Sequence, residues 1–311
     1  MSDTAAWPAT SWQVPDERRR LQLALAALWL LDAVLQFQSY MFTPAFARML
    51  AESADGNPAF VAGPITWSAR IIEHHAVAAN SVFATVQLLL ALGIALRPTV
   101  KIALSASIVW SLAVWWLGEG LGSVLAGIAS PVSGAPGAVI IYALLAILLW
   151  PVRTDRPAAF AAGRSVGTPA ARALWVAAWG SLALLSLQPA VRSPGGLSSM
   201  LADAADGQPG WLAAVDRQAS SLLDHHGLAA SIVLAITLAV IAASVLAPPP
   251  GARAAIVLAV IVAMAIWVAE GLGGIFTGSS TDPDSGPLLA LLAVAYWPAA
   301  AAGDLDQRAG P

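Results

Sequence analysis

The sequence contains no cysteine, a single lysine and few charged residues of any kind. Of its 311 residues, 11% are charged and 58% are hydrophobic. Without cysteine there can be no disulfide, no thiolate catalysis and no cysteine-held zinc or iron–sulfur site. Soluble domains carry about a quarter charged residues, so this chain cannot cover a water-exposed surface. We therefore expect lipid to solvate most of it.

Short motifs of soluble catalysis are also missing. The sequence has no Walker motif, dinucleotide fingerprint, nucleophile elbow or metalloprotease helix. Lys101 is the one residue that could form a Schiff base, and no basic cluster interleaved with aromatic residues indicates a nucleic-acid partner. Any catalysis would depend on a membrane-embedded cofactor or on a partner subunit.

An internal repeat is the strongest feature that is present. Segments match at one offset of 151 residues: Ala54–Phe60 with Ala205–Trp211, Glu73–His75 with Asp224–His226, Trp116–Gly122 with Trp267–Gly273, and Pro136 with Pro287. Trp150-Pro151 and Trp297-Pro298 match at an offset of 147, so the last loop or helix differs by four residues. A run of matches in fixed register predicts two copies of one structural unit.

Each copy has four apolar segments that we predict to be transmembrane helices, because lipid leaves backbone groups no other partners. In the first copy they are Leu21–Phe42, His75–Leu96, Ile102–Gly122 and Pro136–Val152. In the second they are Leu174–Ala190, His226–Leu246, Ala254–Ile275 and Pro287–Ala302. The predicted fold is all-α and polytopic, with eight transmembrane helices in two tandem parallel four-helix repeats.

The distribution of basic residues predicts the orientation. With the N-terminus inside, eleven lysine and arginine residues fall on the inner side and four on the outer side, which places both termini in the cytoplasm of a cell inner membrane. The predicted organisation is an N-terminal tail (1–20), the first repeat (21–152), a cytoplasmic linker (153–172), the second repeat (173–302) and a C-terminal tail (303–311). Pro58–Ile72 and Pro209–Leu223 are expected to form short interfacial helices on the outer side.

Glu119 and Glu270 are the first candidate site residues, because both lie near the outer end of an apolar segment. Counted from Ile102, Glu119 is about 26 Å along its helix, where an ionisable group is costly unless it is paired or hydrated. The glycines around it would allow a ligand or another backbone to come close. The alternative is a solvated glutamate at a frayed helix end.

The four histidines of the chain, His74, His75, His225 and His226, begin the second helix of each copy on the same side. Together with Glu119 and Glu270 they could bind a divalent metal (His75, Glu119, His226 and Glu270), relay protons or donate a hydrogen bond to a quinone. Glu73 and Asp224 precede the pairs. The alternative is a hydrogen-bonded helix cap.

Further polar residues lie inside the apolar segments or between them. Asp32 lies about 17 Å into the first helix, near the midplane, as a proton or cation site or as a neutral acid between helices. Its counterpart by the matching Ala-Leu-Trp triplets is Ala178. Gln38 and Gln188 could add polar contacts to an outer cavity. The loop Thr281–Gly286 lacks a full set of calcium ligands and is interpreted as a proline-stabilised turn.

The layout of each copy resembles the DoxX and DoxD-like membrane proteins. The resemblance lies in Leu31–Phe42 followed by a long outer segment, in the three closely spaced helices that end at Trp150-Pro151, and in the duplication of that layout. No site residue is carried over from that family. The resemblance implies a respiratory or quinone-linked redox accessory.

Three functions remain open from the sequence. The first is a redox accessory that binds quinone or metal at the outer side and works with other membrane redox subunits. The second is a proton-coupled or small-solute transporter that uses Asp32, Glu119 and Glu270. The third is a scaffold whose polar residues only fix helix packing.

Overall fold

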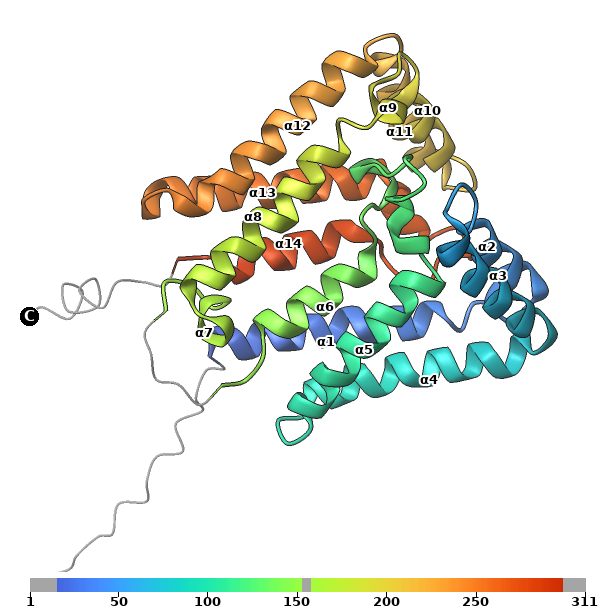
Figure 1. Ribbon diagram of the computed structural model, residues 1–311, viewed down its shortest axis with the longest axis horizontal. Helices are drawn as coiled ribbons and strands as arrows, with labels where there is room; N and C mark the ends of the chain where they lie inside the picture. The colour runs from blue at the N-terminus through green and yellow to red at the C-terminus, as the bar shows by residue number, and fades with distance from the viewer. Residues whose placement is uncertain (1–15, 153–157, 299–311) are drawn as a thin grey trace, which may run out of the picture.

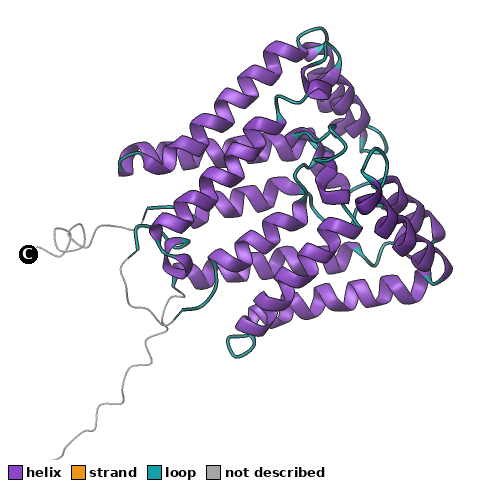
Figure 2. Cartoon of the chain, in the orientation of Figure 1, coloured by secondary structure: helices purple, strands orange, loops and turns teal. Residues whose placement is uncertain are grey.

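The apolar segments fold into helices, as expected for a backbone that must satisfy its own hydrogen bonds in lipid. The computed structural model describes residues 16–152 and 158–298, and over these residues the chain is helical apart from turns and one isolated bridge between Phe160 and Pro298 (Figures 1 and 2). The predicted C-terminal tail and parts of the N-terminal tail and linker lie outside the described residues.

Four helices are long and apolar enough to cross a membrane. They are α4 (Ala76–Ala95), α5 (Val100–Leu117), α12 (Gly227–Ala243, continued by η4, Ser244–Leu246) and α13 (Pro249–Ala269). Large apolar side chains such as Ile102, Val109 and Val233 are about 65–75% exposed on these helices. An outer surface of this kind needs lipid around it, so the chain is a membrane protein.

The other helices of the bundle differ from the predicted spans in length. Helices α1 (Glu17–Leu35) and α8 (Thr168–Leu185) begin and end earlier than predicted, because the chain turns after Leu35 and Leu185. Helices α6 (Ala138–Leu148) and α14 (Ser285–Ala295) have 11 residues each. Eleven residues extend about 16 Å, roughly half of a bilayer core.

The two short helices lie beside each other in the middle of the molecule (Figure 1). Helices α1, α4 and α5 pack on one side, and α8, α12 and α13 pack on the other. Between α1 and α6 the ring of Trp29 stacks on that of Tyr142, with 4.1 Å between the ring centroids. In the second group Trp175 packs between Trp179 and Tyr296.

The helix ends gather at two ends of the bundle, which we call the arginine end and the loop end. At the arginine end, Arg19 donates to the carbonyls of Ile94 and Ala95, and the Tyr296 hydroxyl donates to the Ala171 carbonyl at 2.6 Å. The short α7 (Gly163–Val166), part of the predicted linker, also lies here.

The loop end holds the segments between the first and second long helix of each group. They form η1 (Ser39–Phe42), α2 (Pro44–Glu52), α3 (Ala59–His74), α9 (Pro189–Arg192), α10 (Gly196–Ala204) and α11 (Gly210–Leu223). Helices α3 and α11 match the two predicted interfacial helices, and each exposes a tryptophan, Trp67 and Trp211. Helices α2 and α10 were not predicted.

Candidate carboxyl site between the central helices

The segments that follow α5 and α13 each form a left-handed turn. In η2 (Gly120–Ser123) all four residues have φ between 55° and 64°, and in η5 (Gly271–Gly274) between 55° and 66°. Leu121 and Leu272 adopt this conformation without being glycine, at a cost of about 1–2 kcal/mol each. The turns therefore persist because tertiary contacts stabilise them.

Those contacts are to the segment that precedes each short helix. A Cβ on Gly122 would lie 2.1 Å from the Pro136 carbonyl oxygen, and one on Gly273 would lie 2.4 Å from the Pro283 carbonyl carbon. The Trp115 indole donates to the Pro136 carbonyl at 2.6 Å, and that of Trp267 donates to the Pro283 carbonyl at 2.7 Å. The structure thus gives Pro136 the same role as Pro283, so the predicted pairing of Pro136 with Pro287 is wrong. The four-residue difference falls in the last loop, which in the first half contains η3 (Pro131–Ser133).

Glu119 and Glu270 follow α5 and α13 directly and point to the starts of the short helices. Glu119 Oε1 accepts from the Val139 amide at 3.1 Å, and Glu270 Oε1 accepts from the Ser285 hydroxyl at 2.5 Å. A carboxylate in this position interacts favourably with the positive end of the helix dipole. The second carboxyl oxygen, Oε2, of each glutamate is buried without a hydrogen-bond partner. These hydrogen bonds therefore account for only one oxygen of each carboxyl group.

Asp282 and Asp284 lie beside these glutamates. The Asp284 side chain accepts from the Ser285 amide at 2.7 Å and so caps α14, and Asp282 accepts from the Asp284 amide at 2.8 Å. Asp282 and Asp284 line, together with Glu119, a cavity of about 420 Å³ between the two halves. The interpretation of this loop as only a proline-stabilised turn was incomplete. The sequence did contain a signal for these site residues, because two acids flank Pro283 where Ala135 and Gly137 flank Pro136 in the first half.

These four carboxyl groups lie in the loops that follow or precede the helices. Burial raises the pKa of Asp284 to about 7, and the charge of Asp282 adds to the effect. Burial likewise raises the pKa of Asp282. Burial raises the pKa of Glu119 well above its usual range, and the charge of Asp282 adds to the effect. Burial also raises the pKa of Glu270 well above its usual range, and there the charge of Asp284 adds to the effect. The cluster therefore holds protons near neutral pH.

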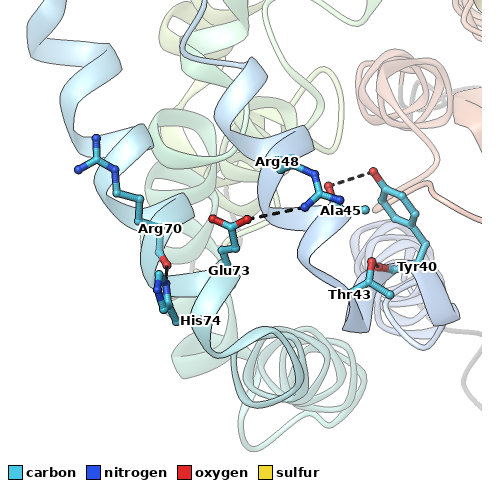
Figure 3. Close-up of polar contacts among 7 residues, drawn as sticks. All are labelled: Tyr40, Thr43, Ala45, Arg48, Arg70, Glu73 and His74. Carbon is cyan, nitrogen blue, oxygen red and sulfur yellow. Dashed lines mark hydrogen bonds and ion pairs between the residues drawn. The ribbon is translucent and has the colours of Figure 1, made fainter.

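The histidine pairs lie elsewhere, exposed at the loop end. His74 Nδ1 is 2.7 Å from the Arg70 carbonyl, and Glu73 is 3.7 Å from Arg48 (Figure 3). In the second half His225 Nε2 is 3.4 Å from Asp224, and His226 Nδ1 is 2.8 Å from the Asp224 carbonyl.

The structure does not bring these histidines to the glutamates. Gly120 contacts the loop before α3, and His74 ends that helix about 24 Å further along. Among the described residues, no group of three or more His, Asp or Glu side chains is placed to hold a metal ion. The predicted metal set of His75, Glu119, His226 and Glu270 is therefore not assembled.

Asp32 lies within the bundle, in the last turn of α1 before its end at Leu35. It is 1% exposed and its Oδ1 has no hydrogen-bond partner. Helices α1 and α8 end with equivalent contacts. Asn80 donates a hydrogen bond to the Gln36 carbonyl after α1, and Ser231 donates one to the Ser186 carbonyl after α8. If Gln36 is equivalent to Ser186, the residue equivalent to Asp32 is Leu182 and not Ala178 as predicted. Leu182 is apolar, as Ala178 is.

Between Asp32 and the arginine end the largest buried side chains are apolar or aromatic, among them Leu25, Trp29 and Leu145, with the buried polar side chains of Gln22, Gln87 and Ser107 among them. Gln38 and Gln188 precede η1 and α9, and the Oε1 of each is buried without a partner. Neither glutamine lines the carboxyl cavity.

Comparison of the chain with protein-family models, with curated proteins and with solved structures gave no match. The resemblance to DoxX and DoxD-like proteins stays a prediction.

Proposed function

We propose that the chain crosses the membrane eight times as two tandem four-helix units of the same orientation. The left-handed turn recurs after α5 and after α13, and so does a glutamate that accepts a hydrogen bond from the first turn of a short helix, which supports the duplication. An indole also contacts the proline carbonyl in both halves, although Trp115 and Trp267 differ by one position in the repeat. The described basic residues divide as predicted, with Arg48, Arg70, Arg192 and Arg217 at the loop end. This asymmetry supports a cytoplasmic arginine end, and hence cytoplasmic termini, in an inner membrane.

For the function, we propose that the cavity binds a small organic cation in exchange for protons. One observation carries this proposal: Glu119, Asp282 and Asp284 converge on a single cavity large enough for a small molecule. Carboxyl groups so close together cannot all ionise without a counter-charge. A bound cation supplies that positive charge. When no cation is bound, protons neutralise the carboxylates instead.

An organic cation fits this cavity better than a metal ion does. The carboxyl oxygens are spread around about 420 Å³, and the described residues offer no metal-binding cluster. The unpartnered Oε2 of Glu119 is an acceptor for a donor group such as an ammonium or guanidinium. Large apolar and aromatic side chains such as Leu25, Trp29 and Leu145 fill most of the bundle toward the arginine end. The proposal therefore covers binding and proton exchange from the loop end.

The test measures binding of methylguanidinium to the purified full chain in detergent from pH 5 to 8. This probe stays charged throughout, so any pH dependence belongs to the protein. We expect affinity to rise as pH rises, by up to about tenfold per unit while one proton is displaced, and to level off above the pKa of Asp284. Glu119→Gln and Asp284→Asn should weaken binding at pH 7.5 by about tenfold or more, the value of one charge-assisted hydrogen bond.

Glu73→Gln is the matched control, because Glu73 is a partly exposed glutamate at the same end of the molecule. It should leave binding unchanged. Affinity that does not depend on pH, or that falls equally in Glu73→Gln and Glu119→Gln, would rule the proposal out.

The redox accessory and the scaffold remain the rival proposals. A redox role requires quinone or metal in the purified protein, and its loss in His75→Ala and His226→Ala; elemental and quinone analysis decides this. A scaffold requires that Glu119→Gln lowers thermal stability and changes no binding of any kind.

A further inference from the structure

An apolar groove lies between the two halves of the bundle. It has a volume of about 310 Å³ and is lined by side chains of α5, α6, α8 and α14, among them Ile108, Ile140, Leu144, Leu174 and Ala178. Of the described residues that line it, Ser181 alone has a polar side chain. On the other side of the central pair α1 contacts α14, whereas α8 has no comparable contact with α6. Because α8 does not pack against α6 as α1 packs against α14, a space remains between α8 and α6, and this space is the groove.

The groove and the carboxyl cavity share one wall. Pro136 lines the groove, and its neighbours Ala135, Gly137 and Ala138 line the cavity. The groove extends from there along α6 and α8, which belong to the lipid-embedded part of the bundle. Residues 135–138 therefore lie between a cavity lined by three carboxyl groups and a groove lined by hydrocarbon side chains.

We propose that the cation bound by the cavity is the head group of an amphiphile whose hydrocarbon tail lies in the groove. This inference rests on the proposed function and specifies its ligand class, a long-chain amine, guanidine or ammonium lipid. Charge complementarity selects the head, because Glu119, Asp282 and Asp284 offer only acceptors when they are ionised. The groove offers almost no hydrogen-bonding groups, so it accommodates a tail and excludes water.

Entry is from the membrane. The ligand partitions into lipid first and reaches the groove laterally, so its tail moves from one apolar medium to another and gains no free energy from leaving water at that step. The groove contributes by fit, which a bulky side chain abolishes.

The experiment compares dodecylguanidinium, methylguanidinium and dodecanol on the full chain in one detergent, by native mass spectrometry at pH 7.5. We expect adducts of dodecylguanidinium at concentrations about tenfold or more below those needed for either reference compound, since the amphiphile alone uses both sites. Ala178→Trp fills the groove and should weaken dodecylguanidinium about tenfold while methylguanidinium still binds. Since detergent partitioning is the same for every variant, it cancels in this comparison.

Val233→Trp, on a lipid-exposed position of α12 outside the groove, is the control for size and should bind like the wild type. Asp284→Asn should reduce the preference for dodecylguanidinium over dodecanol. Unfolding temperature and methylguanidinium binding separate a misfolded Ala178→Trp chain from a blocked groove, and Ala177→Phe provides a second way to fill it.

Equal binding of dodecylguanidinium by wild type, Ala178→Trp and Ala177→Phe would overturn the groove assignment. Tighter binding of dodecanol than of dodecylguanidinium would overturn the cationic head group. If methylguanidinium binds with the expected pH dependence but chain length has no effect, only this inference fails. If wild type does not bind methylguanidinium, the proposed function fails.

Discussion

At the scale of single residues, Glu119 and Glu270 each combine a structural contact with an unused acceptor. In each, one oxygen accepts a hydrogen bond from the first turn of a short helix, from the Val139 amide or the Ser285 hydroxyl, and the other oxygen is buried without a partner. A buried unpartnered acceptor costs about 1–3 kcal/mol, so its retention in both halves calls for a proton or a ligand. Asp282 and Asp284 occur in the second half only, so the two halves carry different total charge around one cavity.

Asp284→Asn should make the stability of the protein less sensitive to pH. The unfolded side chain titrates near 4 and the folded one at about 7, so the folded state holds the extra proton and loses stability as pH rises between these values. Each unit is worth at most about 1.4 kcal/mol. Asparagine keeps the cap but cannot titrate.

Unfolding temperatures at pH 5 to 8 measure this effect. The wild-type value should fall as pH rises from 5 to 7, and the decrease over this range should be smaller in Asp284→Asn. Asp206→Asn, at an exposed position of the loop end, is the control. The same slope in wild type and Asp284→Asn would show that Asp284 does not hold the proton.

At the scale of elements, the left-handed turns η2 and η5 explain why the pattern Glu-Gly-Leu-Gly occurs twice, at residues 119–122 and 270–273. The turn reverses the chain at the end of a spanning helix and lays Gly122 or Gly273 on the carbonyl group of the proline before the short helix. Helices α6 and α14 can then begin inside the bundle, with a glutamate at their N-termini. Non-helical backbone at this depth is tolerated because protein surrounds it.

Gly122→Ala and Gly273→Ala should each destabilise the protein by about 2–4 kcal/mol, because a Cβ adds strain at positive φ and also overlaps a proline carbonyl. Thermal or denaturant unfolding in detergent measures the loss. Gly180→Ala is the matched control, since Gly180 lies in α8 with no atom within 4 Å of a Cβ. It should be neutral or stabilising by up to about 1 kcal/mol. Equal effects at Gly122 and Gly180 would contradict the packing argument.

At the scale of the whole molecule, the two halves meet along α6 and α14, and the carboxyl cavity and apolar groove both lie at that contact. Neither half contains either site alone. In the proposed duplication, the contact between the two halves forms the proposed binding site. The ligand proposed for it depends on the differences between the halves at Asp282, Asp284 and α8.

The absence of cysteine gives a direct test of the orientation. Asp55→Cys and Asp206→Cys place single thiols at the loop end, and Pro98→Cys and Pro250→Cys place them at the arginine end, all at exposed positions. In intact cells a membrane-impermeant maleimide should label the first pair, and the second pair only after permeabilisation. If Asp55→Cys and Asp206→Cys reacted from opposite sides, the parallel repeat and the shared cavity would both be excluded.

The sequence by itself determined that lipid surrounds the chain, that the fold is helical and where the main apolar segments lie. Low charge and long apolar runs suffice for this, because in lipid a backbone has few alternatives to the helix. Glu119 and Glu270 were also found, as rare ionisable groups near the ends of apolar segments. The histidines, chosen by residue type, lie apart from them.

Only the tertiary structure decided which polar groups meet. Asp282 and Asp284 reach Glu119 because a left-handed turn and a short helix bring the last loop of one half onto the other, a contact between positions more than 160 residues apart. Sequence periodicity reports which face of a helix is apolar, and it contains no information on how two halves pack. The site is a property of that packing.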